Sequence, residues 1–194
     1  DIILVGDSLG MVFQGKENTL AVTVDEMIYH GKIVRRGTPE KFIVIDMPFM
    51  SYQVNSEQTL INAGRIIKET NANSVKLEGA GNIVLEAIEK ITQAGIPVIG
   101  HLGFTPQALN KLSGYKIQGK SDTEAQKLIN DAKAVEKAGA FAVVLEMIPA
   151  ALAKEITAAV NIPTISCGAG PNCDGQVLVL DDILGLADHS PKFA

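Results

Sequence analysis

The sequence predicts an α/β fold in which parallel strands are arranged as a (β/α)8 TIM barrel. Short apolar runs alternate along the chain with segments of helical spacing, so the predicted order is strand, helix, strand, helix. Successive strand ends lie about 20 to 45 residues apart, and a barrel of about 250 residues averages about 31 residues per unit. A doubly wound parallel sheet is the alternative that this order leaves open.

Each predicted strand ends at a charged, polar or glycine residue. In residues 40–52, "EKFIVIDMPFMSY", the apolar run stops at Asp46, and Pro48 then prevents further ladder pairing. Continuous apolar runs are typical of parallel strands that are covered on both faces. The other strand candidates are residues 1–8, 73–79, 96–101, 141–147, 162–170 and, last, 182–188, "DILGLAD". Because the chain opens inside a strand, we expect the first strand of the barrel to lie outside this sequence.

Five segments between the strands carry apolar residues at helical spacing. Thr23 with Glu26, and Ser121 with Glu124, have the spacing of capping boxes, and Asn55 is placed to cap another helix. The predicted helices are residues 23–37, 55–70, 82–95, 121–139 and 149–161.

Composition limits the class of protein. The 194 residues are 46% hydrophobic and 20% charged, which is ordinary for one globular domain, here residues 1–194. The net charge of -5 argues against a nucleic-acid partner, and no apolar run is long enough to cross a membrane. Cys167 and Cys173 are too few for a disulfide framework, so we interpret them as bystander thiols in a reducing cytoplasm.

Three acids at strand ends are candidates for a metal site. Asp7, Asp46 and Glu78 follow three consecutive strands, whose carboxyl ends converge at the mouth of a barrel. Carboxylate oxygens suit Mg²⁺, which takes one or two of them together with water and substrate oxygens. The alternative is that each acid caps a helix or lies in a surface turn.

The remaining candidates also lie at strand ends. Lys76 and Glu78 are two residues apart and therefore share one face of a strand, either in a site or as a structural ion pair. Glu146 ends an apolar run in a setting that suits a general base, although it could be a helix-start acid. His101 could bind a substrate oxygen or a metal, or be structural; His30 and His189 are interpreted as structural or exposed.

Two glycine-rich connections have several possible roles. The segment "CGAGPNCDG" follows a strand where many barrels bind phosphate, but it lacks both GxGxxG and the Walker lysine, so close backbone turning is the better interpretation. Residues 101–122 form a long connection that could serve as a lid or could be a surface loop.

Taken together, several blocks resemble the ketopantoate hydroxymethyltransferase family. These are "LVGDSLGMVFQGKENTLAVTVDEMIYH", "VRRG", "DMPFMSY", "VKLEG", "VIGHLGFTPQ", "GYKIQGK", "VLEMIP", "CGAG", "DGQVLVLDDILGL" and "PKFA". The resemblance implies a barrel of the phosphoenolpyruvate mutase and isocitrate lyase type in a homo-oligomer, a decamer. It also implies that the family's first strand and C-terminal helices have no counterpart here, so the single domain is incomplete at both ends.

The resemblance further implies the metal ligands and the reaction. Asp7 and Asp46 match direct Mg²⁺ ligands, and Glu78 matches a metal-associated carboxylate. The reaction is the transfer of a hydroxymethyl group from 5,10-methylenetetrahydrofolate to 3-methyl-2-oxobutanoate, which gives 2-dehydropantoate through an enolate.

By the same resemblance, the keto acid is held by Ser8 with the Asp7 backbone, and by Asp46 and Lys76. His101 contacts the substrate, and Glu146 accepts the proton.

The sequence departs from the family in "ISCGAG", where the family has "IGIGAG", and at Cys173, where threonine is common. Two rivals stay open: an inactive truncated module, and a Mg²⁺-dependent 2-oxo-acid lyase or mutase of the same superfamily. The second rival would be expected to carry a loop cysteine beside the metal, and neither cysteine has an obvious equivalent position.

Overall fold

A parallel β-sheet forms the centre of the computed structural model, which describes residues 1–112, 114–186, 191 and 193. Within these residues seven strands form one sheet in chain order. The strands are β1 (Ile2–Val5), β2 (Phe42–Asp46), β3 (Ser74–Glu78), β4 (Val98–Gly103), β5 (Ala142–Glu146), β6 (Thr164–Cys167) and β7 (Gly175–Gln176). All six predicted strand runs between residues 1 and 170 are confirmed.

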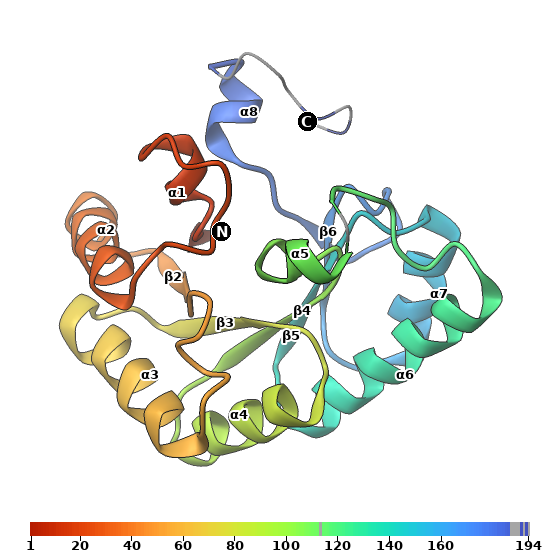
Figure 1. Cartoon of the computed structure of the whole chain (residues 1–194), viewed down its shortest axis with the longest axis horizontal. Coiled ribbons are helices and arrows are strands. Elements are labelled where there is room, and N and C mark those ends of the chain that lie inside the picture. The colour runs from red at the N-terminus through yellow and green to blue at the C-terminus, as the bar shows by residue number, and fades with distance from the viewer. Residues whose placement is uncertain (113, 187–190, 192, 194) are drawn as a thin grey trace.

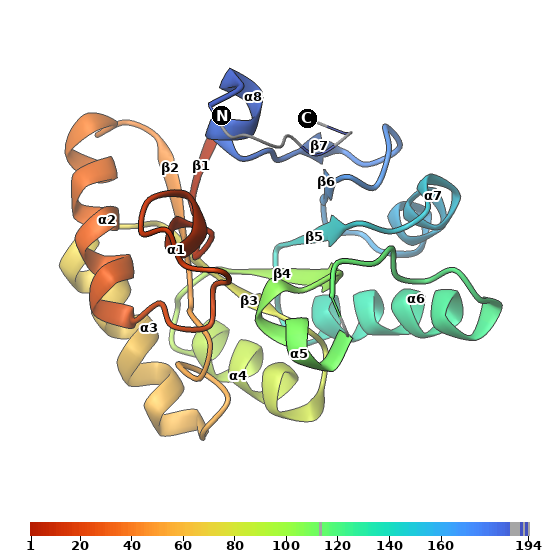
Figure 2. The same ribbon diagram turned by 45° about the horizontal axis from the view of Figure 1, so that its top comes forward.

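Helices follow most of the strands. They are α1 (Leu9–Val12), α2 (Val24–Gly37), α3 (Ser56–Thr70), α4 (Asn82–Gln93), the 3-10 helix η1 (Pro106–Ala108), α5 (Leu109–Leu112), α6 (Asp122–Lys137), α7 (Ala150–Ala159) and α8 (Leu180–Leu184). Figure 1 shows α2, α3, α4, α6 and α7 as an arc around the sheet, and Figure 2 shows β1 and β7 near its two ends. Sequential strand order inside one arc of helices is a barrel arrangement, whereas a doubly wound sheet reverses its strand order.

The helix starts follow the predicted capping chemistry. The Thr23 side chain accepts a hydrogen bond from the backbone N–H of Glu26, and the Glu26 carboxylate accepts one from the backbone N–H of Thr23. Ser121 and Glu124 form the second capping box, and Asn55 accepts from the N–H of Gln58. These bonds satisfy N–H groups that would otherwise be unpaired at a helix start, so the sequence fixes where α2, α3 and α6 begin.

The predicted strand at residues 182–188 is wrong. Residues 180–184 form helix α8, with Asp181 and Asp182 in its first turn and Gly185 in a left-handed conformation (φ 65°) after its end. Acids at a helix start and glycine after its end are helix signals, and they outweigh a short apolar run that fits either structure. Strand β7 lies earlier, at Gly175–Gln176. Residues 187 and 188, and His189, lie outside the described residues.

The inward-facing side chains of the strands form two layers on the inner face of the curved sheet. Val44, Ile99, Ala142 and Val144 form a small buried apolar cluster on the inner face. Two residues further along these strands, the inward side chains are Asp46, His101 and Glu146, because side chains alternate between the two faces. The residues between them, such as Ile43 and Ile45, pack outward in the main core beneath the helices. An apolar floor therefore supports a polar layer at the carboxyl ends of the strands.

His30 lies in α2 and its ring stacks on that of Phe13, with centroids 5.9 Å apart. This agrees with the structural role predicted for His30. Among the described residues, none of the helices is both long and apolar enough to pass through a bilayer.

Candidate active site

Asp7 and Asp46 meet at the ends of neighbouring strands. The backbone N–H of Asp7 donates to Asp46 Oδ2 at 3.1 Å, and both residues are buried. Gly6 precedes this contact, and a Cβ there would lie 3.0 Å from Ser8 Oγ. Ser8 is half-buried beside Asp7 and makes no side-chain capping bond to α1.

Lys76 is the cation at the centre of the group. Its Nζ lies 3.1 Å from Asp46 Oδ1 and 3.8 Å from Glu78 Oε1. Burial lowers the pKa of Lys76, but the carboxylates of Asp46, Glu78 and Asp7 outweigh burial and raise it above its usual value. Lys76 is therefore charged at neutral pH, and it points to the same side of β3 as Glu78, as the sequence predicted.

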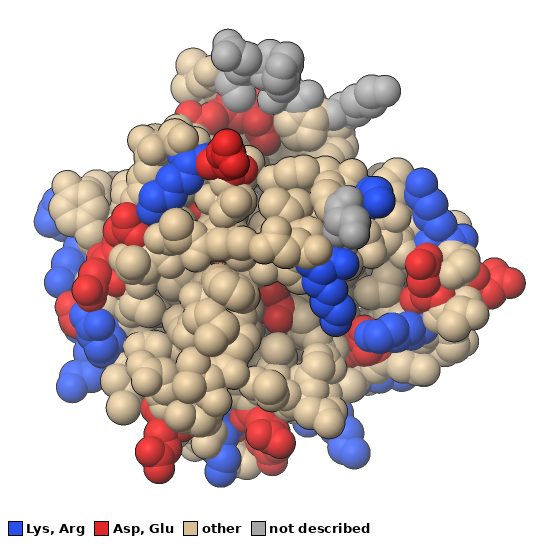
Figure 3. Space-filling view, viewed as in Figure 1, with Lys and Arg blue, Asp and Glu red and all other residues tan. Residues whose placement is uncertain are grey.

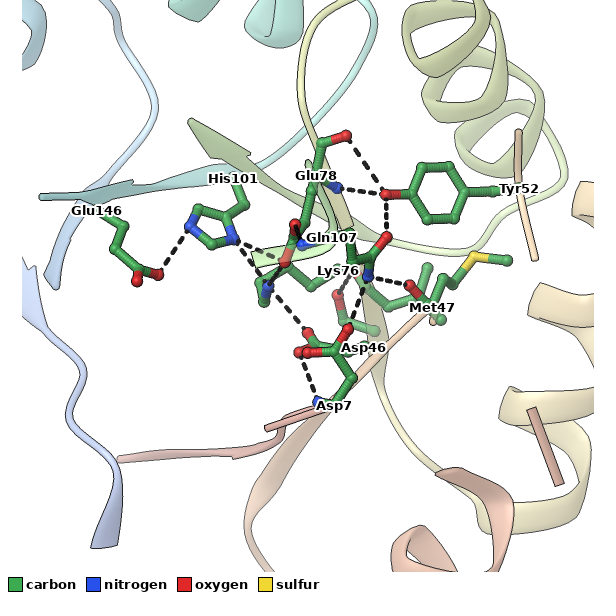
Figure 4. Close-up of polar contacts among 11 residues, drawn as sticks. Asp7, Asp46, Met47, Tyr52, Lys76, Glu78, His101, Gln107 and Glu146 are labelled. Atoms are coloured by element: carbon green, nitrogen blue, oxygen red, sulfur yellow. Dashed lines mark hydrogen bonds and ion pairs between the residues drawn. The ribbon is translucent and has the colours of Figure 1, made fainter. Parts of the chain in front are cut away.

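His101 connects the buried acids to Glu146. Its Nδ1 lies 3.4 Å from Glu78 Oε1, and its Nε2 lies 3.1 Å from Glu146 Oε2 (Figure 4). Burial and Lys76 lower the pKa of His101, but contacts with Glu146 and Glu78 outweigh them and raise it to about 9.

The ring of His101 has two alternative hydrogen-bonding states. Its Nδ1 also lies 3.1 Å from Lys76 Nζ, and an ammonium can only donate. The imidazolium suits the two carboxylates, whereas the neutral tautomer with hydrogen on Nε2 lets Nδ1 accept from Lys76.

Glu146 is the acid nearest to solvent in this group. Its side chain is 18% exposed, compared with 4% for Asp46 and for Glu78. The next residue, Met147, has a left-handed backbone (φ 47°), and its N–H donates to the carbonyl of Cys167 at 2.9 Å. Strained backbone after a strand end is a frequent feature of functional sites.

The strand beside Glu146 must have glycine at position 103. Gly103 has a φ of +91°, and a Cβ there would lie 2.2 Å from the Glu146 carbonyl oxygen. The next N–H, of Phe104, donates to that same oxygen at 2.8 Å. This close contact fixes the backbone that carries Glu146.

Two neutral residues that sequence reasoning missed lie between the acids. The Gln107 side chain donates to Asp7 Oδ2 at 2.9 Å, and its backbone N–H donates to Glu78 Oε2 at 3.0 Å. The Tyr52 hydroxyl is 2.7 Å from Gln107 Oε1 and 3.1 Å from the backbone N of Glu78. The sequence feature that could have indicated them is their place in the chain. Tyr52 is the last residue of "DMPFMSY" and Gln107 is the last residue of "VIGHLGFTPQ", and each lies in the segment that follows a predicted strand end.

Cys167 is unsuited to nucleophilic chemistry. Cys167 pairs with Glu146 across β5 and β6, and burial, followed by the charge of Glu146, raises the pKa of its thiol to about 12. Cys173 is half-buried against the main core. Close backbone turning is confirmed for "CGAG", because Gly170 has a φ of +83° and a Cβ there would lie 2.5 Å from Ala150 Cβ.

The negative charges of Asp7, Asp46 and Glu78 would favour a divalent cation beside Asp7 and Asp46. Burial, together with the charges of Asp46 and Glu78, raises the pKa of Asp7 to about 8. Asp46 Oδ1 is buried and makes no hydrogen bond among the described residues, although it lies near Lys76. Within the same residues, no three side chains of His, Cys, Asp or Glu already form a ligand set. Two carboxylates with water and substrate oxygens are a usual Mg²⁺ environment, and these residues fit it.

Figure 3 shows acidic atoms recessed near the middle of one face, while most other charged side chains lie at its periphery. Buried carboxylates, a lysine and a histidine gathered at the strand ends of a barrel are the arrangement of a barrel enzyme.

Solved structures support the fold class. A putative lyase/mutase from Burkholderia cenocepacia J2315 aligns with a TM-score of 0.65 and 16% identity, covering 96% of this chain and 66% of that one. A 2,3-dimethylmalate lyase of the PEP mutase/isocitrate lyase superfamily aligns with a TM-score of 0.62 and 14% identity, covering 86% and 58%. The chain has the fold of this superfamily, and at these identities the likeness concerns the fold alone.

Sequence relatives identify the family. The profile of ketopantoate hydroxymethyltransferase matches residues 1–194. The 3-methyl-2-oxobutanoate hydroxymethyltransferase of Geobacter sulfurreducens is 56% identical over 194 residues, which are 100% of this chain and 72% of the relative. The protein of the same name from Clostridium beijerinckii is 57% identical over 192 residues, covering 98% and 70%. The chain belongs to the ketopantoate hydroxymethyltransferase family.

Proposed function

We propose that this chain transfers a hydroxymethyl group from 5,10-methylenetetrahydrofolate to 3-methyl-2-oxobutanoate. With one water consumed, the products are 2-dehydropantoate and tetrahydrofolate. The observation that carries the proposal is the link from the partly exposed Glu146, through His101, to the buried group of Lys76, Asp46 and Asp7. Under this proposal Glu146 serves as the proton acceptor at one end of the polar layer, and Asp7 and Asp46 supply oxygen ligands at the other.

Asp7 and Asp46 would hold Mg²⁺, with Glu78 associated with the ion. When bound, Mg²⁺ would supply a Lewis acid that polarises the 2-oxo group and acidifies the C3 proton. Ser8, whose side chain is half-buried beside Asp7, would bind the keto acid together with the Asp7 backbone, Asp46 and Lys76.

Glu146 would accept the C3 proton of the keto acid, and C3 would then form a C–C bond to the one-carbon group of the folate. Overall, both C–N bonds of the folate methylene bridge break, water supplies the hydroxyl oxygen, and the two folate nitrogens take up the C3 proton and one proton of water. Lys76 is held charged by its carboxylate neighbours and adds positive charge where negative charge develops on the substrate oxygen. His101, in contact with Glu146, would orient the base and contact the substrate.

Deuterium exchange tests the proposal without folate. We expect the protein with Mg²⁺ and 3-methyl-2-oxobutanoate in D₂O to deuterate C3, as followed by loss of the C3 proton signal in NMR. Adding 5,10-methylenetetrahydrofolate should then give 2-dehydropantoate. Absence of both reactions would contradict the proposal and favour the inactive-module rival. Exchange without hydroxymethyl transfer would favour a lyase or mutase, although the protonated thiol of Cys167 speaks against a cysteine nucleophile there.

We further propose, from the family resemblance, that residues 1–194 belong to one barrel domain and that the protein is a cytoplasmic homo-oligomer, a decamer. Sedimentation equilibrium of the purified protein tests the oligomer size.

A further inference from the structure

Two neutral side chains, Tyr52 and Gln107, lie in the interior of a site that is otherwise highly charged. They are 1% and 6% exposed, and Figure 4 shows the Tyr52 hydroxyl directed toward Glu78 and Gln107, with Gln107 in turn contacting Asp7. We propose that Tyr52 and Gln107 are positioning residues that orient the Asp7 carboxylate toward a bound Mg²⁺ ion without neutralising its charge. The identity of the ion rests on the proposed function; the orienting role rests on the contacts below.

Gln107 uses all the polar atoms of its amide. Its Nε2 donates to Asp7 Oδ2 and to the carbonyl of Met47, each at 2.9 Å. Its Oε1 accepts from the Tyr52 hydroxyl at 2.7 Å and from Gln53 Nε2 at 3.4 Å. An amide with both donors and its acceptor engaged is held in one orientation.

Backbone groups with fixed roles determine that orientation. The carbonyl of Met47 can only accept, so the atom of Gln107 that faces it must be the amide nitrogen. The N–H of Glu78 can only donate, so Tyr52 accepts from it and directs its own hydrogen to Gln107 Oε1, the shorter of its available contacts. A flipped amide would place its oxygen against the Asp7 carboxylate. Tyr52 thus controls Asp7 through Gln107.

Because the Gln107 side chain is neutral, it can hold the Asp7 carboxylate without adding a positive charge to the site. Asp7 lies near Asp46 and Glu78, and Lys76 is the cation that contacts the latter two acids. A lysine at position 107 would pair with Asp7 and occupy the place of a metal, whereas an amide donor holds the carboxylate and leaves its negative charge available. This explains why a neutral hydrogen-bond donor occupies the centre of an acidic cluster.

The first test is the affinity of Tyr52→Phe for Mg²⁺ alone, measured by isothermal titration calorimetry at pH 8. We expect affinity to fall by about 10-fold, as for other residues that orient a metal ligand, while the circular dichroism spectrum is unchanged. Thr70→Val is the matched control. Thr70 is also buried, and its hydroxyl also accepts from a backbone N–H, that of Ala72, but it lies at the end of α3. The control should lose stability without losing Mg²⁺ affinity.

The second test is the pair Gln107→Met and Tyr52→Phe/Gln107→Met. If Tyr52 acts through Gln107, the double variant should bind Mg²⁺ no more weakly than Gln107→Met alone. The inference would be overturned if the losses of Mg²⁺ affinity in the two single variants were additive in the double variant, or if Tyr52→Phe bound Mg²⁺ within twofold of the parent. It would also be overturned if Thr70→Val lost as much Mg²⁺ affinity as Tyr52→Phe, or if the parent bound no Mg²⁺. A parent that binds Mg²⁺ but does not transfer the hydroxymethyl group would overturn the proposed function alone.

Discussion

His101 Nε2 lies 3.1 Å from Glu146 Oε2, and this contact joins the most solvent-accessible acid of the site to its buried interior. On its other side, His101 Nδ1 is within 3.4 Å of Glu78 and 3.1 Å of Lys76. A change in the charge of Glu146, Glu78 or Lys76 should therefore change the pKa of the His101 imidazole between them.

Removing the charge of Glu146 should separate binding from proton transfer. We expect Glu146→Gln to slow C3 deuterium exchange by at least about 100-fold, because an amide cannot accept the proton. Mg²⁺ and keto-acid affinities, measured by calorimetry, should stay within a few-fold of the parent. Glu155→Gln, at an exposed position of α7, is the control that should leave exchange unchanged. Undiminished exchange in Glu146→Gln would remove this residue from the role of base.

Substitution of Asp46 should affect the metal directly. We expect Asp46→Ala to lower Mg²⁺ affinity by more than about 100-fold, beyond the loss typical of residues that only orient a ligand. It should also weaken keto-acid binding in the presence of Mg²⁺. Asp25→Asn, whose parent side chain is 79% exposed, should leave both affinities unchanged. An unaltered Mg²⁺ requirement in Asp46→Ala would count against ligation by Asp46.

Stability of the metal-free protein should fall as pH rises from 6.5 to 9. The pKa of Asp7 is raised from 3.8 to about 8 by burial and acidic neighbours, and that of His101 from 6.5 to about 9 by its carboxylate contacts. Both groups bind a proton more tightly when folded than when unfolded, so their stabilisation is present at low pH and is lost on deprotonation.

We expect Tm in EDTA to drop by at least about 4 °C across this range, as measured by differential scanning calorimetry. Asp7→Asn should reduce the slope, and Mg²⁺ should reduce it in the parent because a cation favours the ionised carboxylate. A Tm that is flat or rises with pH in EDTA would show that these groups do not titrate as described.

Gly103 should tolerate no side chain. We expect Gly103→Ala to cost about 2 to 4 kcal/mol of unfolding free energy, because its φ is +91° and the new Cβ would lie 2.2 Å from the Glu146 carbonyl oxygen. Gly64→Ala is the matched control. Gly64 lies inside α3, where a Cβ would meet nothing within 4 Å, so alanine should stabilise by about 1 kcal/mol. Urea unfolding of the two variants compares them; a loss below 1 kcal/mol for Gly103→Ala would contradict the close approach.

The strands and their ends could be predicted because local chemistry specifies them. A buried parallel strand reads as a continuous apolar run, and a carboxylate such as Asp46 is stable at its end only where a site or solvent receives it. The capping pairs Thr23–Glu26 and Ser121–Glu124 likewise act within three residues. Helix α8 was missed because five apolar and acidic residues, Leu180–Leu184, carry too little periodicity to separate helix from strand.

The charged residues of the site could be predicted, and its neutral ones could not. Asp7, Asp46, Glu78, His101 and Glu146 stand out because buried charge is costly and requires an explanation. Tyr52 and Gln107 belong to residue types that occur in turns and in cores alike. Their role comes from partners distant in the sequence: Gln107 is 55 residues from Tyr52, and Asp7 is 100 residues from Gln107. Tertiary contacts of this kind have no local signal. The structure shows that these charged residues lie together, whereas the catalytic, substrate-binding and metal-binding roles assigned to them, to Lys76 and to Ser8 stay predictions. The role of the connection over residues 101–122 also stays a prediction.

The strictly sequential strand order has a consequence for how the protein acquires its function during folding. Gln107 bonds to Asp7 across 100 residues, so this contact can form only after β1, β2, β3 and β4 have docked in one sheet. Helices with their own caps, such as α2 and α6, need no such long loop closure. During refolding, far-UV dichroism should therefore recover ahead of cation affinity, and the active centre is among the last parts of the chain to mature.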